Sequence, residues 1–266
     1  MKLDFKGKTA LVTGASAGIG REIARQLAAE VACLVLVARR QERLDELAAE
    51  LRAKRADLCV LTRAVDISDR DAAGAMLDAL DAEGVGVDIL INNAGFGDYG
   101  LFEQREWEKL ERMIDLNVTS ATFFLHRLIP LMVTRGFGAI LNVGSVAGMV
   151  SNPAIATYGA TKAYLNFLSE SLRAELAGTG VVVTALCPGP VPTEFQEVAG
   201  TGPRPPVPGL AQVSAPACAR AGIEGLKKGK PRVIPGVMRA AAAVEALPKP
   251  LVRPLLARAG KQLRRM

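Results

Sequence analysis

The chain has 266 residues, 50% of them hydrophobic and 23% charged, which is the composition of a globular protein with enough apolar material for one large core. With three Tyr, one Trp and eight Phe it lacks material for an aromatic stacking surface, and no nucleic-acid partner is expected. Its four cysteines are scattered and it has one histidine, so we expect no metal site, no disulfide framework and a reducing, cytoplasmic location.

The net charge of +6 is unevenly distributed along the chain. Residues 226–266 carry eleven Lys or Arg and one acidic residue, Glu245, so the remaining 225 residues are mildly acidic. This distribution argues against a nucleic-acid-binding body. No run of eighteen apolar residues is present, and no membrane-spanning helix is expected.

Short apolar runs alternate with longer segments of helical spacing from residue 9 to residue 234. The predicted strands are 9–13, 33–38, 58–64, 89–92, 138–143, 181–186 and 232–234, and the predicted helices are 19–31, 41–54, 69–83, 107–135 and 157–178. Near-continuous Val, Leu and Ile in the strands indicate burial on both faces and therefore a parallel sheet. The sequence predicts a single α/β domain over residues 1–236, a doubly wound Rossmann fold of about seven parallel strands flanked by helices.

A glycine-rich segment, TGASAGIG, joins the first predicted strand to the first helix. Glycines let the backbone approach a diphosphate closely, and the helix start offers free N–H groups to the same anion. A structural turn is the alternative, but a strand before and a helix after are the context that a nucleotide cradle requires. The predicted cofactor contacts here are Gly14, Ser16, Gly18, Ile19 and Gly20.

The end of the second strand, VLVARRQERL, bears on the choice of nicotinamide cofactor. A site that prefers NAD usually has a carboxylate here for the ribose hydroxyls, whereas this chain has Ala38 followed by Arg39 and Arg40. A guanidinium can bind a 2′-phosphate in a bidentate, charge-assisted way. The sequence therefore predicts NADP(H), although Arg40 could equally be a solvated charge at the helix entry.

Tyr158 and Lys162 lie four residues apart on a predicted helix, so their side chains share one face. A phenol of pKa about 10 is a poor acid or base at neutral pH, and an ammonium nearby is expected to lower that pKa. Such tuning serves general acid–base catalysis. Ser145 follows the strand GAILNV, and its hydroxyl could donate to a substrate oxygen. In isolation, a Tyr and a Lys four residues apart are common on helix surfaces.

These motifs together resemble those of the short-chain dehydrogenase/reductase family. TGASAGIG is similar to its TGxxxGxG, residues 92–95 to its NNAG, and Pro188–Gly189 to its PG motif, all in order between Lys8 and about Phe195. The resemblance implies a catalytic set of Asn117, Ser145, Tyr158 and Lys162. Tyr158 would be the general acid/base, Lys162 would also hold the nicotinamide ribose, and Asn117 would hold a water that relays protons to solvent.

The family resemblance also implies further cofactor contacts and favours Arg39 as the 2′-phosphate ligand. Asp66 matches the residue that contacts the adenine, and Thr193 matches the one that binds the carboxamide. The full set of contacts implied beyond the glycine segment is Arg39, Arg40, Asp66, Asn93, Ala94, Gly95, Tyr158, Lys162, Pro188, Gly189, Val191 and Thr193.

The expected function is that of an NADP(H)-dependent oxidoreductase that reduces a ketone, aldehyde or 3-oxoacyl group to an alcohol, or catalyses the reverse. A catalytically silent nucleotide sensor and an epimerase or dehydratase on the same fold are the alternatives. Ala147, Met149, Val150 and Phe195, with a Pro- and Gly-rich loop over 193–216, indicate an apolar substrate pocket. Relatives are commonly homodimers or homotetramers, so a homo-oligomer is implied.

Residues 237–266 are predicted to form a basic, amphipathic helical extension. Its apolar positions repeat every four residues at Leu251, Leu255, Ala259 and Leu263, with arginines and Lys261 around them. Such a helix could lie on an anionic membrane as a peripheral contact. Alternatively, its apolar face could pack on the body or on a partner subunit, and the sequence leaves both placements open.

Overall fold

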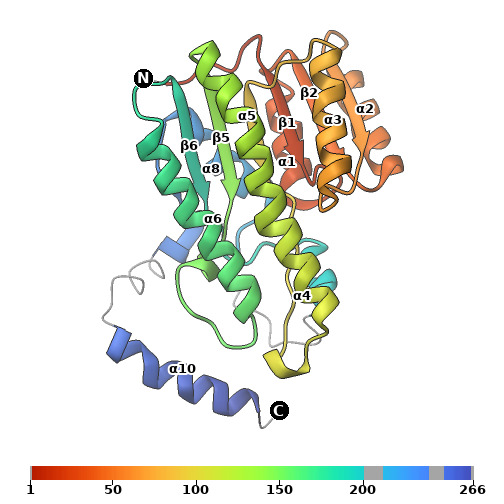
Figure 1. Cartoon of the computed structure of the whole chain (residues 1–266). Helices are drawn as coiled ribbons and strands as arrows, with labels where there is room; N and C mark the ends of the chain where they lie inside the picture. The colour runs from red at the N-terminus through yellow and green to blue at the C-terminus, as the bar shows by residue number, and fades with distance from the viewer. Residues whose placement is uncertain (1, 201–211, 240–248, 265–266) are drawn as a thin grey trace.

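The computed structural model describes residues 2–200, 212–239 and 249–264 (Figure 1). One sheet of seven strands, all paired in parallel, has the order β3-β2-β1-β4-β5-β6-β7. The strands are β1 (Thr9–Thr13), β2 (Cys33–Ala38), β3 (Cys59–Ala64), β4 (Ile89–Asn92), β5 (Gly138–Val143), β6 (Val181–Leu186) and β7 (Arg232–Val233). The predicted single-domain, doubly wound fold is confirmed.

Helices cover both faces of this sheet (Figure 1). Helices α1 (Gly18–Leu27), α2 (Gln41–Lys54) and α8 (Ala215–Lys227) pack on one face, and α3 (Arg70–Ala82), α5 (Ala121–Arg135) and α6 (Ala156–Glu175) pack on the other. Alternate residues of each strand enter opposite cores: Leu34 and Leu36 face α1 and α2, while Val35 and Val37 face α3 and α5. Burial on both sides explains the near-continuous apolar runs.

The predicted helix over 107–135 is continuous but contains one wider turn. Helix α4 (Trp107–Ile114) passes through a π-helical turn, η2 (Asp115–Ser120), into α5. The Ser120 hydroxyl donates to the carbonyl oxygens of Ile67, at 2.5 Å, and of Asp115, at 2.9 Å. Such turns are frequent at functional sites, and this one contains Asn117.

This same segment, Trp107–Arg135, is long and apolar enough to cross a membrane by length and composition, although the sequence reading expected no such helix. A helix in the core of a globular protein passes the same test. Here Phe124, Leu125 and Leu128 are buried against the sheet. Packing on the strands therefore accounts for part of the apolar character of the segment, while Ile114, Leu131 and Val133 remain exposed.

The region predicted as a loop over 193–216 contains more helix than expected. A short helix, α7 (Phe195–Val198), lies within it, residues 201–211 lie outside the described part, and α8 begins at Ala215. Helix α8 was not predicted, although Ser214 caps it by accepting from the Ala217 N–H at 3.4 Å and a proline follows in the first turn. Helix α1 ends at Leu27 rather than near Val31, because the chain turns there to enter β2.

The C-terminal extension includes the predicted helix, which spans Lys249–Leu263 as α10 after a short turn, η5 (Gly236–Met238). Residues 240–248, and the side chains of Leu251, Leu255 and Ala259, lie outside what the structure describes. Helix α10 lies beyond the carboxyl ends of the strands (Figure 1). Arg264, just after it, pairs with Glu103 of the turn η1 (Phe102–Gln104) at 2.6 Å.

Candidate active site

A cleft of about 1450 Å³ opens at the carboxyl ends of the strands, where a doubly wound sheet is expected to bind ligands. Gly20 and Asn117 do not line it and lie behind its wall. The predicted residues that line it are Gly14, Ser16, Gly18, Ile19, Arg39, Arg40, Asp66, Asn93, Ala94, Gly95, Ser145, Tyr158, Lys162, Pro188, Gly189, Val191 and Thr193.

The glycine segment forms a cradle that side chains would fill. Gly14 has φ +67° and Gly18 has φ +54°, a left-handed conformation that favours glycine. A Cβ on Gly20 would lie 2.4 Å from the Gly14 carbonyl oxygen, and one on Gly18 would lie 3.2 Å from the Thr193 methyl. The start of α1 therefore presents backbone N–H groups to the cleft without side-chain cover, which fits a diphosphate.

The NNAG segment is tied to this cradle by hydrogen bonds. The Asn93 amide donates to the carbonyl oxygens of Thr13, at 2.9 Å, and Gly14, at 3.3 Å. The Thr13 hydroxyl accepts from the N–H groups of Asn93 and Ala94, both at 3.0 Å. These bonds fix the loop after β4 against the loop after β1, so Ala94 and Gly95 form one wall of the cleft.

The two arginines after β2 differ in their contacts. Arg39 has a 62% exposed side chain and lies 3.7 Å from Asp66, the predicted adenine contact. Arg40 donates to the Ser16 hydroxyl at 3.2 Å and to Glu194 at 2.9 Å, so it is the one attached to the glycine cradle. The sequence favoured Arg39 as the ligand of a 2′-phosphate, whereas Arg40 is the arginine that contacts Ser16 of the glycine cradle.

Tyr158 and Ser145 face each other across the cleft. The Ser145 hydroxyl accepts from the Ala147 N–H at 3.0 Å and lines the cleft together with Tyr158. Burial raises the pKa of Tyr158 to about 12, and the nearby Ser145 hydroxyl opposes that rise. The expected lowering of this pKa by Lys162 is not seen here, because loss of solvation dominates.

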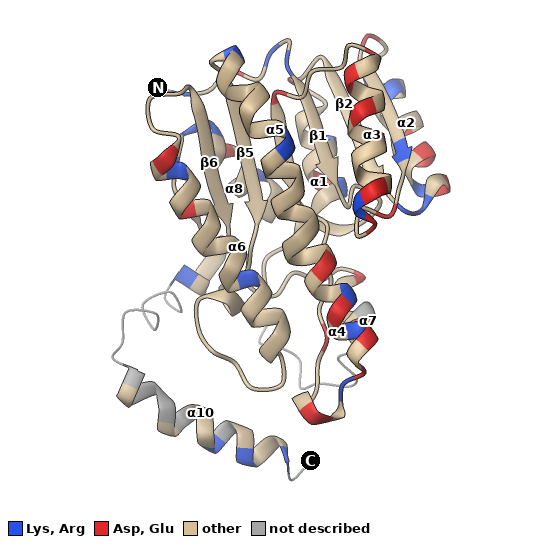
Figure 2. Cartoon of the chain, viewed as in Figure 1, with Lys and Arg blue, Asp and Glu red and all other residues tan. Residues whose placement is uncertain are grey.

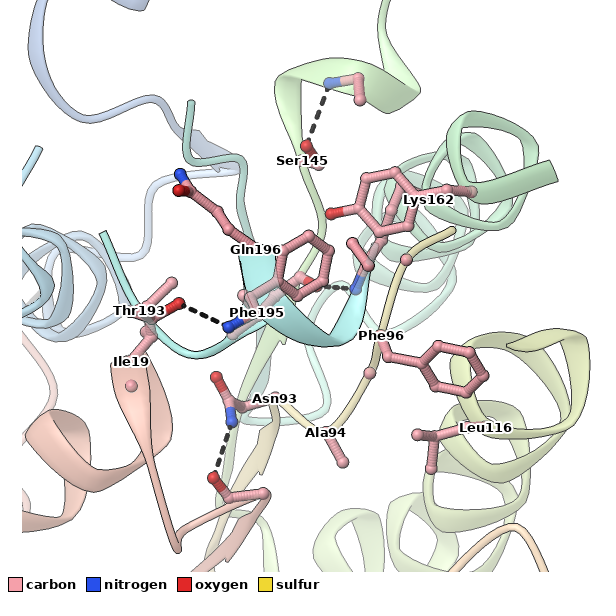
Figure 3. A pocket seen from close by; sticks show the side chains of 18 of the residues that line it. Ile19, Asn93, Ala94, Phe96, Leu116, Ser145, Lys162, Thr193, Phe195 and Gln196 are labelled. Atoms are coloured by element: carbon pink, nitrogen blue, oxygen red, sulfur yellow. Dashed lines mark hydrogen bonds between the residues drawn. The ribbon is translucent and has the colours of Figure 1, made fainter. Parts of the chain in front are cut away.

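Lys162 is buried behind Tyr158, with 4% of its surface exposed. Its Nζ donates to the Val143 carbonyl oxygen at 2.8 Å and lies 6.0 Å from the centre of the Tyr158 ring. Burial lowers the pKa of Lys162 to about 8. In Figure 3 dashed lines mark the hydrogen bond of the Lys162 ammonium and, higher in the view, that of the Ser145 hydroxyl.

Asn117 is buried in the π-helical turn and bridges two walls of the cleft. Its Oδ1 accepts from the Phe96 N–H at 3.1 Å, and its Nδ2 donates to the Phe96 carbonyl oxygen at 2.9 Å and to the Thr161 hydroxyl at 3.0 Å. A Cβ on Gly95 would lie 2.8 Å from this Oδ1 and 3.3 Å from the Lys162 Nζ. Asn117 and Lys162 thus meet at Gly95, and Lys162 lines the same cleft as Ser145 and Tyr158.

Comparison with known proteins identifies the family. The sequence model of the short chain dehydrogenase family matches residues 8–203 of this chain. The chain belongs to the short-chain dehydrogenase/reductase family. It is 40% identical over 189 residues to a sulfoacetaldehyde reductase of Chromohalobacter salexigens, an alignment that covers 69% of this chain and 72% of that protein.

Solved structures of other short-chain dehydrogenases have the same fold. A short-chain dehydrogenase from Sphingobium yanoikuyae in complex with NADPH is 36% identical, with a TM-score of 0.80 over 90% of this chain and 93% of that one. One from Burkholderia phymatum in complex with NAD is 27% identical, with a TM-score of 0.79 over 91% and 93%. Relatives of this dehydrogenase/reductase therefore occur with either cofactor.

Several residues that support this site were missed by the sequence analysis. Asn166 donates to the Ser145 carbonyl oxygen at 3.1 Å and accepts from the Cys187 thiol at 3.2 Å, which ties α6 to the strand ends. Its position four residues after Lys162, on the same helix face, was an available signal. Glu194 was also missed, because its partners come from distant segments.

The substrate end of the cleft is apolar on most sides. The Phe195 ring lies 5.4 Å from that of Tyr158, and Leu256 of α10 also lines the cleft. Other apolar lining residues are Phe96, Ala147, Met149, Val150, Ile155 and Met238. One buried acid, Asp98, lies at the same end and pairs with Lys109 at 2.6 Å.

Proposed function

We propose that this short-chain dehydrogenase/reductase transfers hydride between NADP(H) and a ketone, aldehyde or acyl carbonyl, with Tyr158 as the general acid/base. The observation that carries the proposal is that Tyr158, Ser145 and Lys162 line one cleft, which continues into the glycine cradle. The acid, hydroxyl and cation in the cleft argue against a silent nucleotide sensor, and the reductase and dehydrogenase names of the relatives favour hydride transfer over an epimerase or dehydratase.

The residues of the cleft fit a nicotinamide dinucleotide. The open backbone at Gly14 and Gly18 and the free start of α1 suit a diphosphate. Asp66 and Arg39 would lie by the adenosine, and Lys162, Pro188, Gly189, Val191 and Thr193 would lie by the nicotinamide half. When bound, the cofactor supplies the hydride.

The protein's own groups would manage the proton and the charge. A pKa of about 12 keeps the Tyr158 phenol protonated at neutral pH, the form that can donate to a carbonyl oxygen. The Ser145 hydroxyl would hydrogen-bond the same oxygen as negative charge develops there. The Lys162 ammonium would stabilise the phenolate that remains, and Asn117 would hold Thr161, the neighbour of Lys162, in position.

The preference for NADP(H) is supported by the charges after β2. Ala38 offers no carboxylate to repel a 2′-phosphate, and Arg40 with Ser16 offers donors beside the cradle. We expect kcat/KM to be at least about tenfold higher with NADPH than with NADH, since one charge-assisted contact is typically worth 1.5–3 kcal/mol. Initial rates with both cofactors over ketones and aldehydes of graded chain length measure this ratio. A preference for NADH would contradict the proposal.

We propose an apolar substrate and a homo-oligomeric, cytoplasmic protein. The ring of Phe195 and the side chains of Met149 and Val150 support the first. The homo-oligomeric state is supported by Phe167 of α6, which is 74% exposed, and by Tyr164 on the same helix, which is 41% exposed. Exposed apolar groups gathered on one helix commonly mark subunit contacts, and light scattering on the purified chain measures the oligomeric state.

A further inference from the structure

Glu194 lies between the two ends of the cofactor cleft. It follows Thr193, the predicted carboxamide ligand, but its carboxylate points to the adenosine end, where it accepts from Arg40 at 2.9 Å. Arg43 of α2 donates to its other oxygen. Arg40 also contacts the Ser16 hydroxyl, so one carboxylate is held by two guanidinium groups beside the cradle.

The groups around the Glu194 carboxylate are ones that would also bind a phosphate. Two guanidinium groups around two oxygens, with a hydroxyl adjacent, are donors that also suit a phosphate. Hydrogen bonds from Arg43 and Arg40 hold the pKa of Glu194 below its usual range, so the group is a carboxylate at neutral pH. In the cofactor-free protein a negative charge of the chain itself therefore engages the arginine that a 2′-phosphate would need.

We propose that Glu194 competes with the 2′-phosphate of NADP(H) for Arg40, so that binding of a 2′-phosphorylated nucleotide displaces this carboxylate. The inference rests on the proposed cofactor preference and adds a residue that sets its strength. Side chains of Arg40, Arg43 and Glu194 are 38–43% exposed, and ion pairs this exposed contribute little to stability. The ion pair of Glu194 with Arg40 therefore opposes phosphate binding by a small free energy, and a bound 2′-phosphate can replace the carboxylate.

Displacement of Glu194 would act on the substrate end, because its neighbours contact both halves of the site. Thr193 lies over Gly18, and its hydroxyl accepts from the Phe195 N–H at 3.3 Å. The Phe195 ring in turn lies against Tyr158, 5.4 Å between ring centres. Figure 3 shows Thr193 close to Ile19 and Phe195 between Thr193 and Lys162. Residues 193–195 therefore connect the 2′-phosphate position with the catalytic tyrosine.

The test is to compare Glu194→Gln with the wild-type chain by calorimetric titration with NADPH, NADH, 2′,5′-ADP and 5′-AMP. We expect the variant to bind NADPH and 2′,5′-ADP roughly two- to fivefold more tightly, with unchanged affinity for NADH and 5′-AMP. High salt should reduce the gain. Glu197→Gln, on the next exposed acid of the same segment, is the matched control and should change none of the four affinities.

Unchanged or weaker NADPH binding by Glu194→Gln, or equal tightening of NADPH and NADH, would overturn the inference. Weaker binding of both dinucleotides would show instead that Glu194 closes over the bound cofactor. The proposed cofactor preference has a separate readout, the ratio of kcat/KM with NADPH and NADH for the wild-type chain, which does not depend on the effect of Glu194→Gln. Arg40→Ala should abolish the effect of Glu194→Gln, because the competed donor is then gone.

Discussion

Lys162 shows how the site places charge where the fold alone would avoid it. The ammonium is buried with one hydrogen bond, to Val143, among the contacts described, and burial brings its pKa from 10.5 to about 8. Removing an ammonium from water costs free energy that one neutral carbonyl does not return. A charge kept there at such a cost is consistent with a catalytic role for this lysine.

Lys162→Met should stabilise the chain at pH 7 by about 2 kcal/mol, since a depressed pKa makes the charged form a burden on the folded state. Between pH 8 and pH 10.5 the unfolded chain binds more protons at this lysine than the folded chain does, so wild-type stability rises with pH. The advantage of the variant should therefore shrink over that range.

Urea unfolding at a series of pH values measures this difference, with exposed Lys6→Met as the control that should show none. A variant less stable than wild type at pH 7, or an advantage independent of pH, would contradict the account of Lys162.

The strands show what local sequence could predict. Five of the seven have their predicted bounds, because runs such as CLVLVA are buried on both faces and end at polar or glycine residues. The π-helical turn at Asn117 was not foreseen, since its contacts are with distant segments, whereas α8 was missed despite the local signals of Ser214 and the proline after it. Arg40 was ranked below Arg39 for the same reason: its partner Glu194 lies 154 residues away.

The close packing of the glycine cradle can be tested by comparing a glycine-to-alanine substitution in α1 with one in α3. Gly20→Ala in α1 should lower stability by about 1–3 kcal/mol and weaken NADPH binding, because the new Cβ would lie 2.4 Å from the Gly14 carbonyl oxygen. Gly74→Ala in α3 is the control: its Cβ would lie 3.6 Å from Phe123, an ordinary contact.

Alanine at position 74 should raise stability by about 0.5–1 kcal/mol through helix propensity and leave cofactor affinity unchanged. Unfolding curves and NADPH titrations of both variants give the comparison. If Gly20→Ala were as stable as wild type and bound NADPH normally, the cradle would not need its close packing.

The whole chain combines a mildly acidic Rossmann body with a basic extension (Figure 2). All four charged residues within α10 are basic, while acids and bases are mixed over α2 and α3. Leu256 lines the cleft and Arg264 pairs with Glu103, and both contacts support packing of the helix on the body rather than on a membrane. We propose that the extension helps to cover the substrate end.

The proposed chemistry is tested most directly by the rate of hydride transfer in the variant Tyr158→Phe. This rate is measured in a stopped-flow single turnover with NADPH and the best carbonyl substrate. The variant should bind NADPH within about twofold of wild type, since its ring and packing remain, and lose at least about 100-fold in rate with the proton donor. Retention of the wild-type rate by Tyr158→Phe would contradict the assignment of Tyr158 as the general acid/base.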